Sequence, residues 1–465
     1  MKISCVFSTN VFRQVLAAVA TSLYGISAGI VFAYSAVLLP QLKDDDRIDY
    51  DAKYDTWIAS ISTLTMAFGC FVAGPFIDRY GRRIGLILLA IPFVFSWLIM
   101  GLGSNIYLLL LGRAVAGICA GLFRTMSIVY LSEVTDPKHR SMMLISISLS
   151  LNIGILVSHS AGTYLYWRTA SYVFCIPNIL PVIILVYLKE SPLWLITKGK
   201  IQDGTDFFYW FRAKSDVADR ELSAAICKQK HKSQDLNVKE TIKVVFSRPF
   251  MVPFSICFLV FTQTQFCGTN VFNFYAPDLI KQTFSNNVDN FLIMVLIDFI
   301  RVCGTGSIFF TVKHVPRRFL YCLCSIVTTF CILFLAAYLY YQSSNLLWFG
   351  MTSLVMYIYF SITFMSIGWS FISEMFPSSV RGLGSASTAS TSFLLLFIAV
   401  KMTPSVIDAF GMEVYYIICA CITAVCTIIL YFVLPETNGK TLQEIEHDFI
   451  KDKCNKELSN EQTKF

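Results

Sequence analysis

The stretch EVTDPKHR at positions 133–140 has a counterpart, EMFPSSVR, at positions 374–381. Each stretch begins with a glutamate, ends with an arginine seven residues further on, and follows a long apolar run. Charged residues that recur in the same arrangement between apolar runs indicate two related halves. In a membrane protein, such a repeat is typical of a carrier that moves one half against the other.

The composition favours a membrane protein. Of the 465 residues, 55% are hydrophobic and only 14% are charged, a balance that is too apolar for a soluble protein of this length. Because a helix needs ~20 mostly apolar residues to cross a bilayer core, the apolar runs predict twelve transmembrane helices. The seventh and the tenth are long enough to be tilted or broken. The predicted spans are 12–39, 56–77, 84–103, 106–132, 141–165, 168–188, 249–280, 289–312, 318–340, 345–373, 382–406 and 411–434.

The predicted spans form two groups of six, so the expected fold class is an all-α membrane protein with two six-helix halves. We expect an N-terminal half at 1–188, a linker at 189–248, a C-terminal half at 249–434 and a tail at 435–465. The linker mixes charges with aromatic residues, which favours short amphipathic helices at the membrane surface. A plain charged linker is the alternative.

The basic residues set the expected orientation. They gather in the short loops after the second, fourth and eighth spans, and such loops are cytoplasmic by the positive-inside rule. Both termini are then cytoplasmic, and the net charge of +7 reflects the inner leaflet rather than a nucleic-acid partner. The cysteines lie mostly within spans and no CxxC spacing occurs, so we expect no metal site and no cofactor. The loop residues are Arg79, Arg82, Arg83, Lys138, Arg140, Lys313, Arg317 and Arg318.

Five motifs follow one another along almost the whole chain. They are Gly74-x3-Asp78-Arg79-x-Gly81-Arg82-Arg83; Gly112-Arg113 with Gly117, Gly121, Tyr130-x2-Glu133 and Arg140; Glu190-Ser191-Pro192-x-Trp194-Leu195; Gln265-x2-Gly268-x-Asn270 with Phe274-Tyr275; and Pro435-Glu436-Thr437-x-Gly439-Lys440. In this order they resemble the motifs of the sugar porter branch of the major facilitator superfamily. Within that branch the chain is most similar to the insect facilitated trehalose transporters. The resemblance implies the twelve-helix fold of that superfamily.

Charged residues at the inner helix ends are candidates for a salt-bridge gate. A carrier must seal its inner side and release that seal cheaply, which ion pairs near water allow. The alternative is that these residues only anchor helix ends among lipid headgroups, but anchoring alone does not require acids and bases to alternate. The resemblance implies one gate between the halves, with Asp78, Arg82, Arg83, Glu133, Arg140, Arg317, Glu374 and Arg381.

A sugar is neutral and rich in hydroxyls, so its site needs amide groups for hydrogen bonds and an aromatic face for the ring. Gln265 and Asn270 supply amides on the seventh span, and Gly268 between them allows close approach or a break in the helix. The alternative is that these polar residues only join helices. The resemblance implies substrate contacts at Gln265, Asn270, Trp369, Thr264 and Ile155, and an outer gate at Phe274 and Tyr275.

Several amide ligands of the family's hexose site are replaced here. Smaller hydroxyl-bearing residues stand where the family has a glutamine, a glutamate and an asparagine, and a phenylalanine stands where it has a tryptophan. The usual asparagine of the eighth span falls at an arginine. The substituted positions are Ser148, Ser361, Ser392, Phe393 and Arg301.

Two arginines fall inside predicted spans, where a charge is costly and therefore a functional candidate. Arg301 has Asp298 three residues before it, so a same-helix ion pair is its alternative role. Arg124 has no acid within one helical turn, which leaves a distant partner, a position near the headgroups or an anionic substrate. Lys401 and His159 are ambiguous, and we expect them to face water near span ends.

The sequence therefore predicts a carrier and not an enzyme. Ser27 stands where proton-coupled relatives carry an aspartate on the first span, so we expect facilitated transport of trehalose or a hexose by alternating access. One alternative keeps the fold but moves an organic anion through Arg124 and Arg301; another is a nutrient sensor that transports poorly. We expect a multi-pass plasma-membrane protein that works as a monomer.

Overall fold

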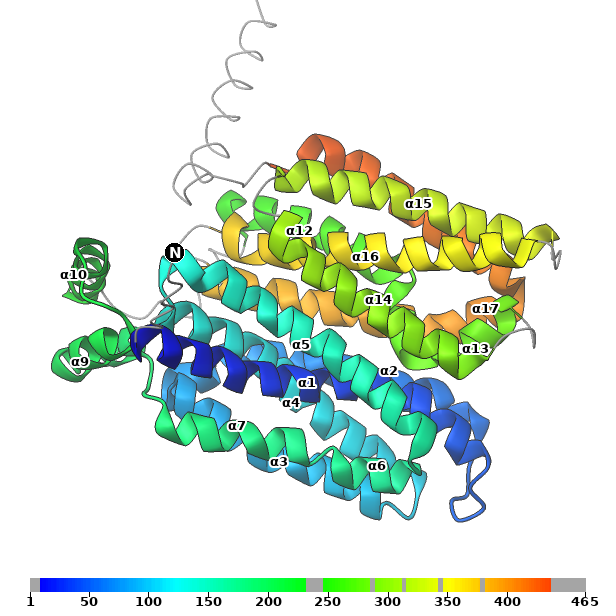
Figure 1. The fold of residues 1–465 in the computed structure, drawn as a ribbon, viewed down its shortest axis with the longest axis horizontal. Helices are drawn as coiled ribbons and strands as arrows, with labels where there is room; N and C mark the ends of the chain where they lie inside the picture. Colours follow the sequence, from blue (N-terminus) through cyan, green and yellow to red (C-terminus); the bar gives the residue numbers. More distant parts are fainter. Residues whose placement is uncertain are drawn as a thin grey trace, which may run out of the picture. The chain divides into compact units, whose positions relative to one another are not determined.

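The computed structural model describes residues 9–230, 246–284, 289–311, 315–341, 346–376 and 381–435. All regular structure in these residues is helical (Figure 1). The chain forms two compact units. The first comprises 1–234, 272–281 and 285–302, and the second comprises 235–271, 282–284 and 303–465.

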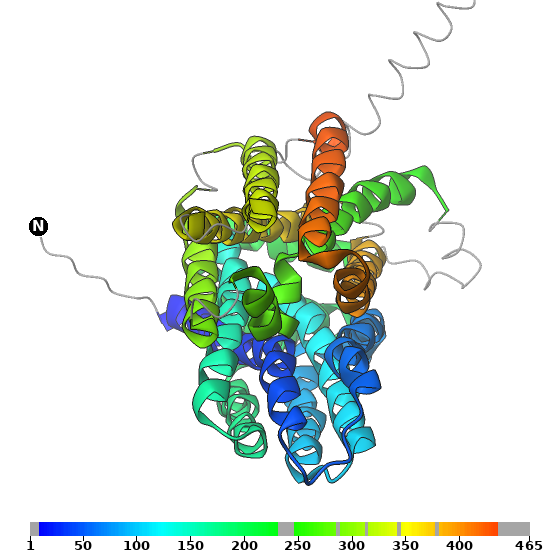
Figure 2. The same ribbon diagram turned by 90° about the vertical axis from the view of Figure 1, so that its right-hand side faces the viewer.

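The first unit contains a bundle of long helices, which Figure 2 shows nearly end-on in blue and cyan. Helix α2 packs on α4, α1 packs on α5 and α7, and α3 packs on α4, α6 and α7. The helices are α1 Thr9–Lys43, α2 Asp55–Tyr80 after the 3-10 turn η1 Ala52–Tyr54, α3 Arg82–Leu102, α4 Ile106–Val134, α5 Pro137–Tyr164, α6 Trp167–Val173 and α7 Ile176–Tyr187.

Glycines of the predicted motif explain why α2 and α4 approach so closely. A Cβ atom on Gly117 would lie 2.3 Å from the backbone oxygen of Ser62, and one on Gly121 would lie 2.2 Å from that of Met66. Neither separation is possible for real atoms, so larger residues at these positions would force the helices apart. Small residues at such spacing are typical of helix contacts in membranes.

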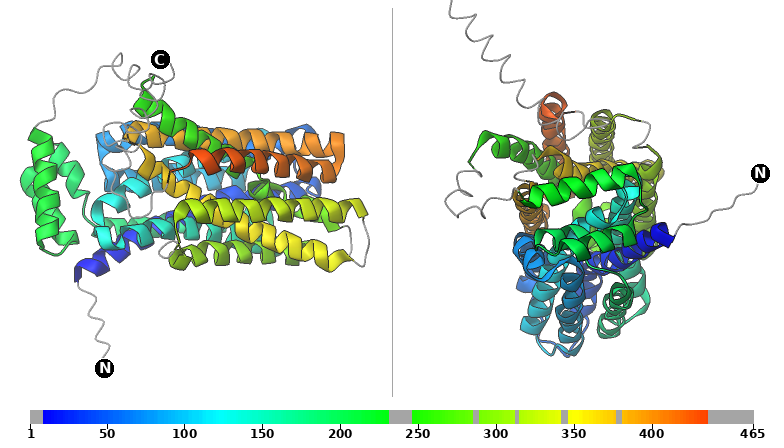
Figure 3. Two further views of the ribbon diagram at one scale, coloured as in Figure 1. Left: turned by 90° about the horizontal axis from the view of Figure 1, so that it is seen from above. Right: turned by 90° about the vertical axis from the view of Figure 1, so that its left-hand side faces the viewer.

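Three short helices follow the bundle: α8 Pro192–Thr197, α9 Ile201–Phe211 and α10 Asp216–Lys230. The last two run across the direction of the long helices (Figure 3). Their apolar side chains form a small core with Ile196, Phe208 and Leu222. Residues 192–230 are thus mostly helical, whereas the position of these helices at a membrane surface stays a prediction; residues 231–245 lie outside the described part.

The second unit contains α12 Arg248–Phe266, the 3-10 turn η2 Thr269–Val271, α15 Arg317–Tyr341, α16 Leu347–Met375 and α17 Arg381–Val433. Helix α15 packs on α16 and α17, and α12 packs on α17 and α16. Helices α13 Phe272–Phe284 and α14 Asn290–Thr311 contribute residues to both units.

The described residues supply all twelve predicted spans. Ten helices are long and apolar enough to cross a membrane, and a bent pair, Phe250–Phe266 with Thr269–Phe284, makes an eleventh span. Helix α17 supplies two spans, because its 53 residues would extend ~80 Å, far beyond the ~30 Å bilayer core. At Gly411 (φ 87°) the chain turns, and the red part of α17 runs back in the direction opposite to that of the orange part (Figures 1 and 3).

Two predictions about broken spans have different outcomes. The seventh span is broken as expected: α12 ends at Phe266, Gly268 has φ +89°, and the chain bends by 54° before it continues as α13. A positive φ is readily adopted by glycine alone, which explains why the break falls at this residue. The tenth span is predicted to be tilted or broken; α16 is one continuous helix of 29 residues and is therefore not broken, and its tilt stays a prediction.

Candidate functional site

An ion cluster centred on Arg82 of α3 lies in the first unit, with partners on α2 and α4. Its Nε lies 3.0 Å from Glu133 Oε2, its Nη2 donates to Glu133 Oε1 at 3.1 Å, and its Nη1 lies 3.0 Å from Asp78 Oδ1. Glu133 also accepts a hydrogen bond from the hydroxyl of Ser191. The side chains of Arg82 and Glu133 are 11% and 15% exposed, whereas that of Asp78 is 72% exposed. The two-point contact between Arg82 and Glu133 is therefore the shielded one.

Glu190 caps the start of α3. The N-cap residue Gly81 has no side chain to offer, and the first amides of a helix have no partner within it. Glu190 Oε1 accepts from the backbone amides of Arg82 and Arg83 at 2.9 Å, and Oε2 accepts from that of Ile84 at 3.2 Å. The sequence identifies the motif that contains Glu190, but it does not predict that Glu190 caps α3.

Arg140 and Arg83 have partners that sequence reasoning missed. Arg140 Nη2 lies 3.4 Å from Glu221 on α10, and the same carboxylate lies 2.6 Å from Arg212 Nη1. Burial lowers the pKa of Arg212. Arg83 donates to the backbone oxygens of Leu185 and Val186 at the end of α7 rather than to an acid.

The remaining gate candidates belong to the second unit. Arg317 is half-buried at the start of α15. The side chains of Glu374 and Arg381 lie outside the described part of the chain, as do Lys313 and the motif after Pro435. Ion pairing between the two halves therefore stays a prediction.

In the second unit, the two predicted amide ligands meet at the break between α12 and α13. Asn270 Nδ2 donates to Gln265 Oε1 at 2.6 Å, and Gln265 Nε2 donates to Ser392 Oγ on α17 at 2.8 Å. Gln265 is buried and Asn270 is half-buried. Ser392 stands where the family has an asparagine, so a hydroxyl takes the place of an amide in this cluster.

Trp369 lies beside the same part of α17. Its ring packs on Phe261 of α12, with centroids 4.8 Å apart, and on Phe393, with centroids 5.8 Å apart. Because Phe393 follows Ser392, the tryptophan and the amide pair gather on neighbouring positions of α12, α16 and α17. Thr264 is fully buried, and its hydroxyl donates to the backbone oxygen of Phe261 within its own helix.

A second glutamine on α12, Gln263, lies outside the motif and was not predicted as a functional residue. Gln263 Nε2 donates to Thr427 Oγ1 at 2.7 Å and to the hydroxyl of Ser325, and Gln263 Oε1 accepts from Tyr321 at 2.7 Å. It is fully buried. Two residues along a helix turn by about 200°, so Gln263 and Gln265 lie on nearly opposite faces of α12.

The other predicted substrate contacts lie in the first unit. Ile155 on α5, Arg124 on α4 and Arg301 on α14 are all buried, with 1%, 7% and 1% of each residue exposed. Of the predicted outer gate, Phe274 is fully buried with its ring 5.9 Å from that of Phe32 on α1, and Tyr275 is 6% exposed.

The expectation that His159 faces water is wrong. The residue is 1% exposed, and its Nδ1 lies 2.6 Å from Asp298 Oδ2. Asp298, for which the sequence offers only Arg301 as a neighbour, thus bonds a residue of another helix. Lys401 is half-buried on α17.

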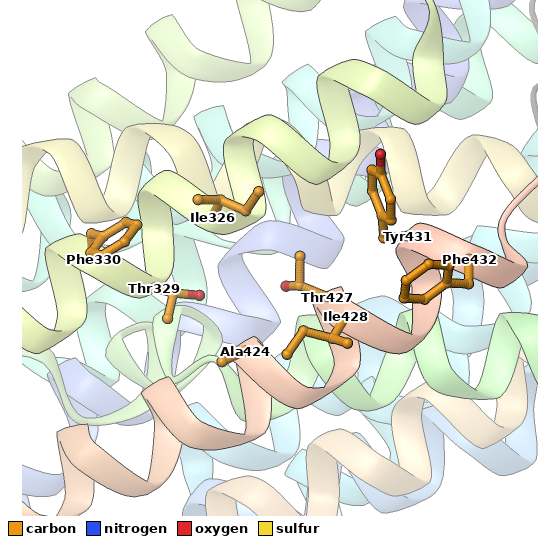
Figure 4. A pocket seen from close by; sticks show the side chains of 8 residues that line it. All are labelled: Ile326, Thr329, Phe330, Ala424, Thr427, Ile428, Tyr431 and Phe432. Atoms are coloured by element: carbon orange, nitrogen blue, oxygen red, sulfur yellow. The ribbon is translucent and has the colours of Figure 1, made fainter.

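An apolar groove between α15 and the end of α17 is not a solute site (Figure 4). Several of its apolar side chains are more than 40% exposed, as expected for a surface that faces acyl chains. None of the described residues that line it is charged. The lining residues are Ile326, Thr329, Phe330, Ala424, Thr427, Ile428, Tyr431 and Phe432.

The sequence model of the family described as "Sugar (and other) transporter" matches residues 14–449. The chain belongs to this family. Among curated relatives, the facilitated trehalose transporter Tret1 of Apis mellifera ligustica is 27% identical, over 94% of this chain and 88% of that protein. Tret1 of Polypedilum vanderplanki is 25% identical, over 95% and 88%.

Solved structures agree on the fold of this sugar transporter. The major facilitator superfamily proton:xylose symporter XylE, bound to 6-bromo-6-deoxy-D-glucose, has a TM-score of 0.79 at 18% identity, over 95% of this chain and 100% of that one. The inward-open XylE of E. coli has a TM-score of 0.71. The chain is thus a multi-pass membrane protein with the twelve-helix fold of that superfamily, and the relatives named here are transporters rather than enzymes.

Proposed function

We propose that this member of the sugar transporter family is a uniporter for trehalose or a hexose that works by alternating access. The observation that carries the proposal is the cluster at the break after α12, where Gln265, Asn270 and Trp369 gather around Ser392 and Phe393. Amides and an indole face are the groups that a hydroxyl-rich ring requires. The Tret1 relatives, named as trehalose transporters, support the substrate class.

In the proposed mechanism, the halves at 1–188 and 249–434 rock about this cluster, with 189–248 as linker and 435–465 as tail. Arg82, Glu133, Arg140, Arg317, Glu374 and Arg381 close the inner side, and Phe274 and Tyr275 close the outer side. The shielded Arg82–Glu133 pair lies within the first unit. The ion pairs that we propose between the halves would lie near water, where they exchange for hydration at modest net cost, which suits a seal that must reopen. The basic inner loops support cytoplasmic termini, and we place the protein in the plasma membrane as a functional monomer.

Uptake measurements distinguish this proposal from an anion carrier. In oocytes that express the chain, labelled trehalose or glucose should enter saturably and without stimulation by an inward proton gradient. The buried Arg124 and Arg301 favour an organic anion as the second candidate. If the parent chain takes up an organic anion but no sugar, and Arg301→Gln abolishes the anion uptake, then the substrate is the anion rather than a sugar.

Two glutamines on one helix give a matched test of the binding cluster. We expect Gln265→Ala to raise the KM for sugar about tenfold, because it removes two hydrogen-bonding groups worth about 0.5–1.5 kcal/mol each. Gln263→Leu should instead lower the melting temperature with little change in KM, because it leaves Tyr321, Ser325 and Thr427 short of a partner. Equal increases in KM for both variants would contradict the assignment of Gln265 to the binding site and of Gln263 to a purely structural role.

A further inference from the structure

The break in the seventh span leaves backbone groups at membrane depth that a continuous helix would satisfy. Helix α12 ends at Phe266, the chain passes through Cys267 and Gly268, and the turn η2 begins at Thr269. Irregular backbone is tolerated in the bilayer core only where neighbouring parts of the protein supply its hydrogen bonds. Within the second unit, α16 supplies two of them.

Tyr357 of α16 makes the first of these bonds, before the break. Its hydroxyl donates to the backbone oxygen of Cys267 at 2.8 Å, and the residue is fully buried. The same hydroxyl lies against Gly268, because a Cβ atom on that glycine would be 3.0 Å from it. Gly268 therefore allows a close approach in addition to its positive φ, and the tyrosine fits the broken backbone.

Thr269 and Ser361 make the second bond, after the break. Thr269 Oγ1 donates to Ser361 Oγ at 2.7 Å, and Ser361 Oγ donates to the backbone oxygen of Ile358 within α16 at 3.0 Å. Both residues are fully buried. Because the two hydroxyls bond inside the protein, they are placed to fix η2 on α16 rather than to contact a solute.

Tyr357 and Ser361 share one face of an unbroken helix. They are four residues apart on α16, and Gly368 follows on the same face about three turns after Tyr357. A Cβ atom on Gly368 would lie 3.0 Å from Val260 Cγ1 of α12. One face of α16 thus contacts α12 before the break and η2 after it, and the continuous helix supports the broken span on both sides.

The hydrogen bond between Gln265 and Asn270 spans the same break. Gln265 lies at the end of α12 and Asn270 in η2, so their 2.6 Å bond depends on the angle at which η2 leaves α12. Thr269 directly precedes Asn270. Because Tyr357 and Ser361 hold the chain on the two sides of the break, they hold this angle.

We propose that Tyr357 and Ser361 are positioning residues of the solute site. Their hydrogen bonds hold the broken span on α16 and thereby set Asn270 against Gln265. The proposal rests on the proposed function for the statement that this amide pair binds a sugar. The statement that α16 positions the pair does not depend on the identity of the solute.

Tyr357→Phe tests the proposal, with a second buried tyrosine as its control. Tyr321 of α15 is also fully buried, and its hydroxyl donates to Gln263 on the other face of α12. Both Tyr→Phe substitutions remove one buried hydroxyl and should lower the melting temperature. Only Tyr357→Phe should also raise the KM for sugar, by about three- to tenfold with little change in the maximal rate, because it alone disturbs the amide pair.

Thr269 provides a test of the second bond with a conservative variant. Thr269→Val removes the hydroxyl that donates to Ser361 and should raise the KM for sugar to a similar extent. Thr269→Ser keeps the hydroxyl, so its KM should stay close to that of the parent chain. A KM that rises equally in both variants would contradict a role for this hydrogen bond.

A double-mutant cycle measures the positioning of the amide pair without any solute. Gln265→Ala and Asn270→Ala, alone and together, give the coupling of the pair as a shift in melting temperature in detergent. We expect this coupling to fall by about half or more in Tyr357→Phe and to persist in Tyr321→Phe. Equal coupling in the two backgrounds would overturn the proposal even if sugar uptake is confirmed. If the parent chain takes up no sugar, the proposed function fails, and a loss of coupling confined to Tyr357→Phe would still support the positioning role.

Discussion

Replacing Glu133 with glutamine should destabilise the protein far more than replacing Asp78 with asparagine, although both acids contact Arg82. Glu133 and Arg82 are shielded and joined by two contacts, and removal of one partner from a buried ion pair costs about 3 kcal/mol or more. Asp78 is 72% exposed, so water screens its contact and the cost should be below about 0.5 kcal/mol. Melting temperatures in detergent and sugar uptake, measured on both variants, give the comparison.

A double-mutant cycle separates the pair from other effects of the substitution. Arg82→Gln combined with Glu133→Gln leaves no shielded charge without a partner, because the remaining Asp78 is 72% exposed to water. The double variant should therefore be more stable than the sum of the single effects indicates. Additive effects would show that the two residues act independently. The contact between Arg82 and Glu133 would then not be what stabilises the ion cluster around Arg82.

The transmembrane spans could be predicted from the sequence because length and apolar character are local properties. The break in the seventh span was also foreseeable, since Gly268 interrupts an apolar run that is long for one crossing. The tenth span was harder to judge. Its apolar run is also long for one crossing, but no residue in α16 requires a positive φ, and so the helix continues through all 29 residues.

The partners of the charged residues could not be predicted, because they come from distant parts of the chain. Arg140 meets Glu221 across 81 positions, and His159 meets Asp298 across 139. Sequence spacing reveals only neighbours on the same helix. This is why Asp298 suggested Arg301 alone, and why the sequence placed His159 in water.

The contacts of the cluster at the break after α12 could be predicted from the sequence only in part. Gln265 and Asn270 stand in one motif, and their mutual bond follows from the turn at Gly268. Their contact with α17 does not follow from the motif. The serine that replaces an asparagine at position 392 suggests a lost ligand, whereas the structure shows that its hydroxyl accepts from Gln265. Substitution of a ligand residue in a sequence therefore need not remove the polar contact.

Glu190→Ala should cause a loss of stability comparable to that of Glu133→Gln. Glu190 accepts from three consecutive backbone amides at the start of α3, where the helix offers no partner of its own. Each buried amide left without an acceptor costs about 1–3 kcal/mol. The negative carboxylate also interacts favourably with the positive end of the helix dipole. We expect about 3 kcal/mol in total, read as a lower melting temperature in detergent.

Glu190→Gln provides the control, because it keeps one oxygen acceptor but removes the charge and should lose about half as much. The effect should also reach Arg82, which is the first residue of α3 and depends on the cap for its position. In Glu190→Ala the coupling between Arg82 and Glu133, measured by the same double-mutant cycle, should therefore weaken. Wild-type stability in Glu190→Ala would mean that water replaces the carboxylate at the amides, and that a residue 7% exposed is nevertheless reached by solvent.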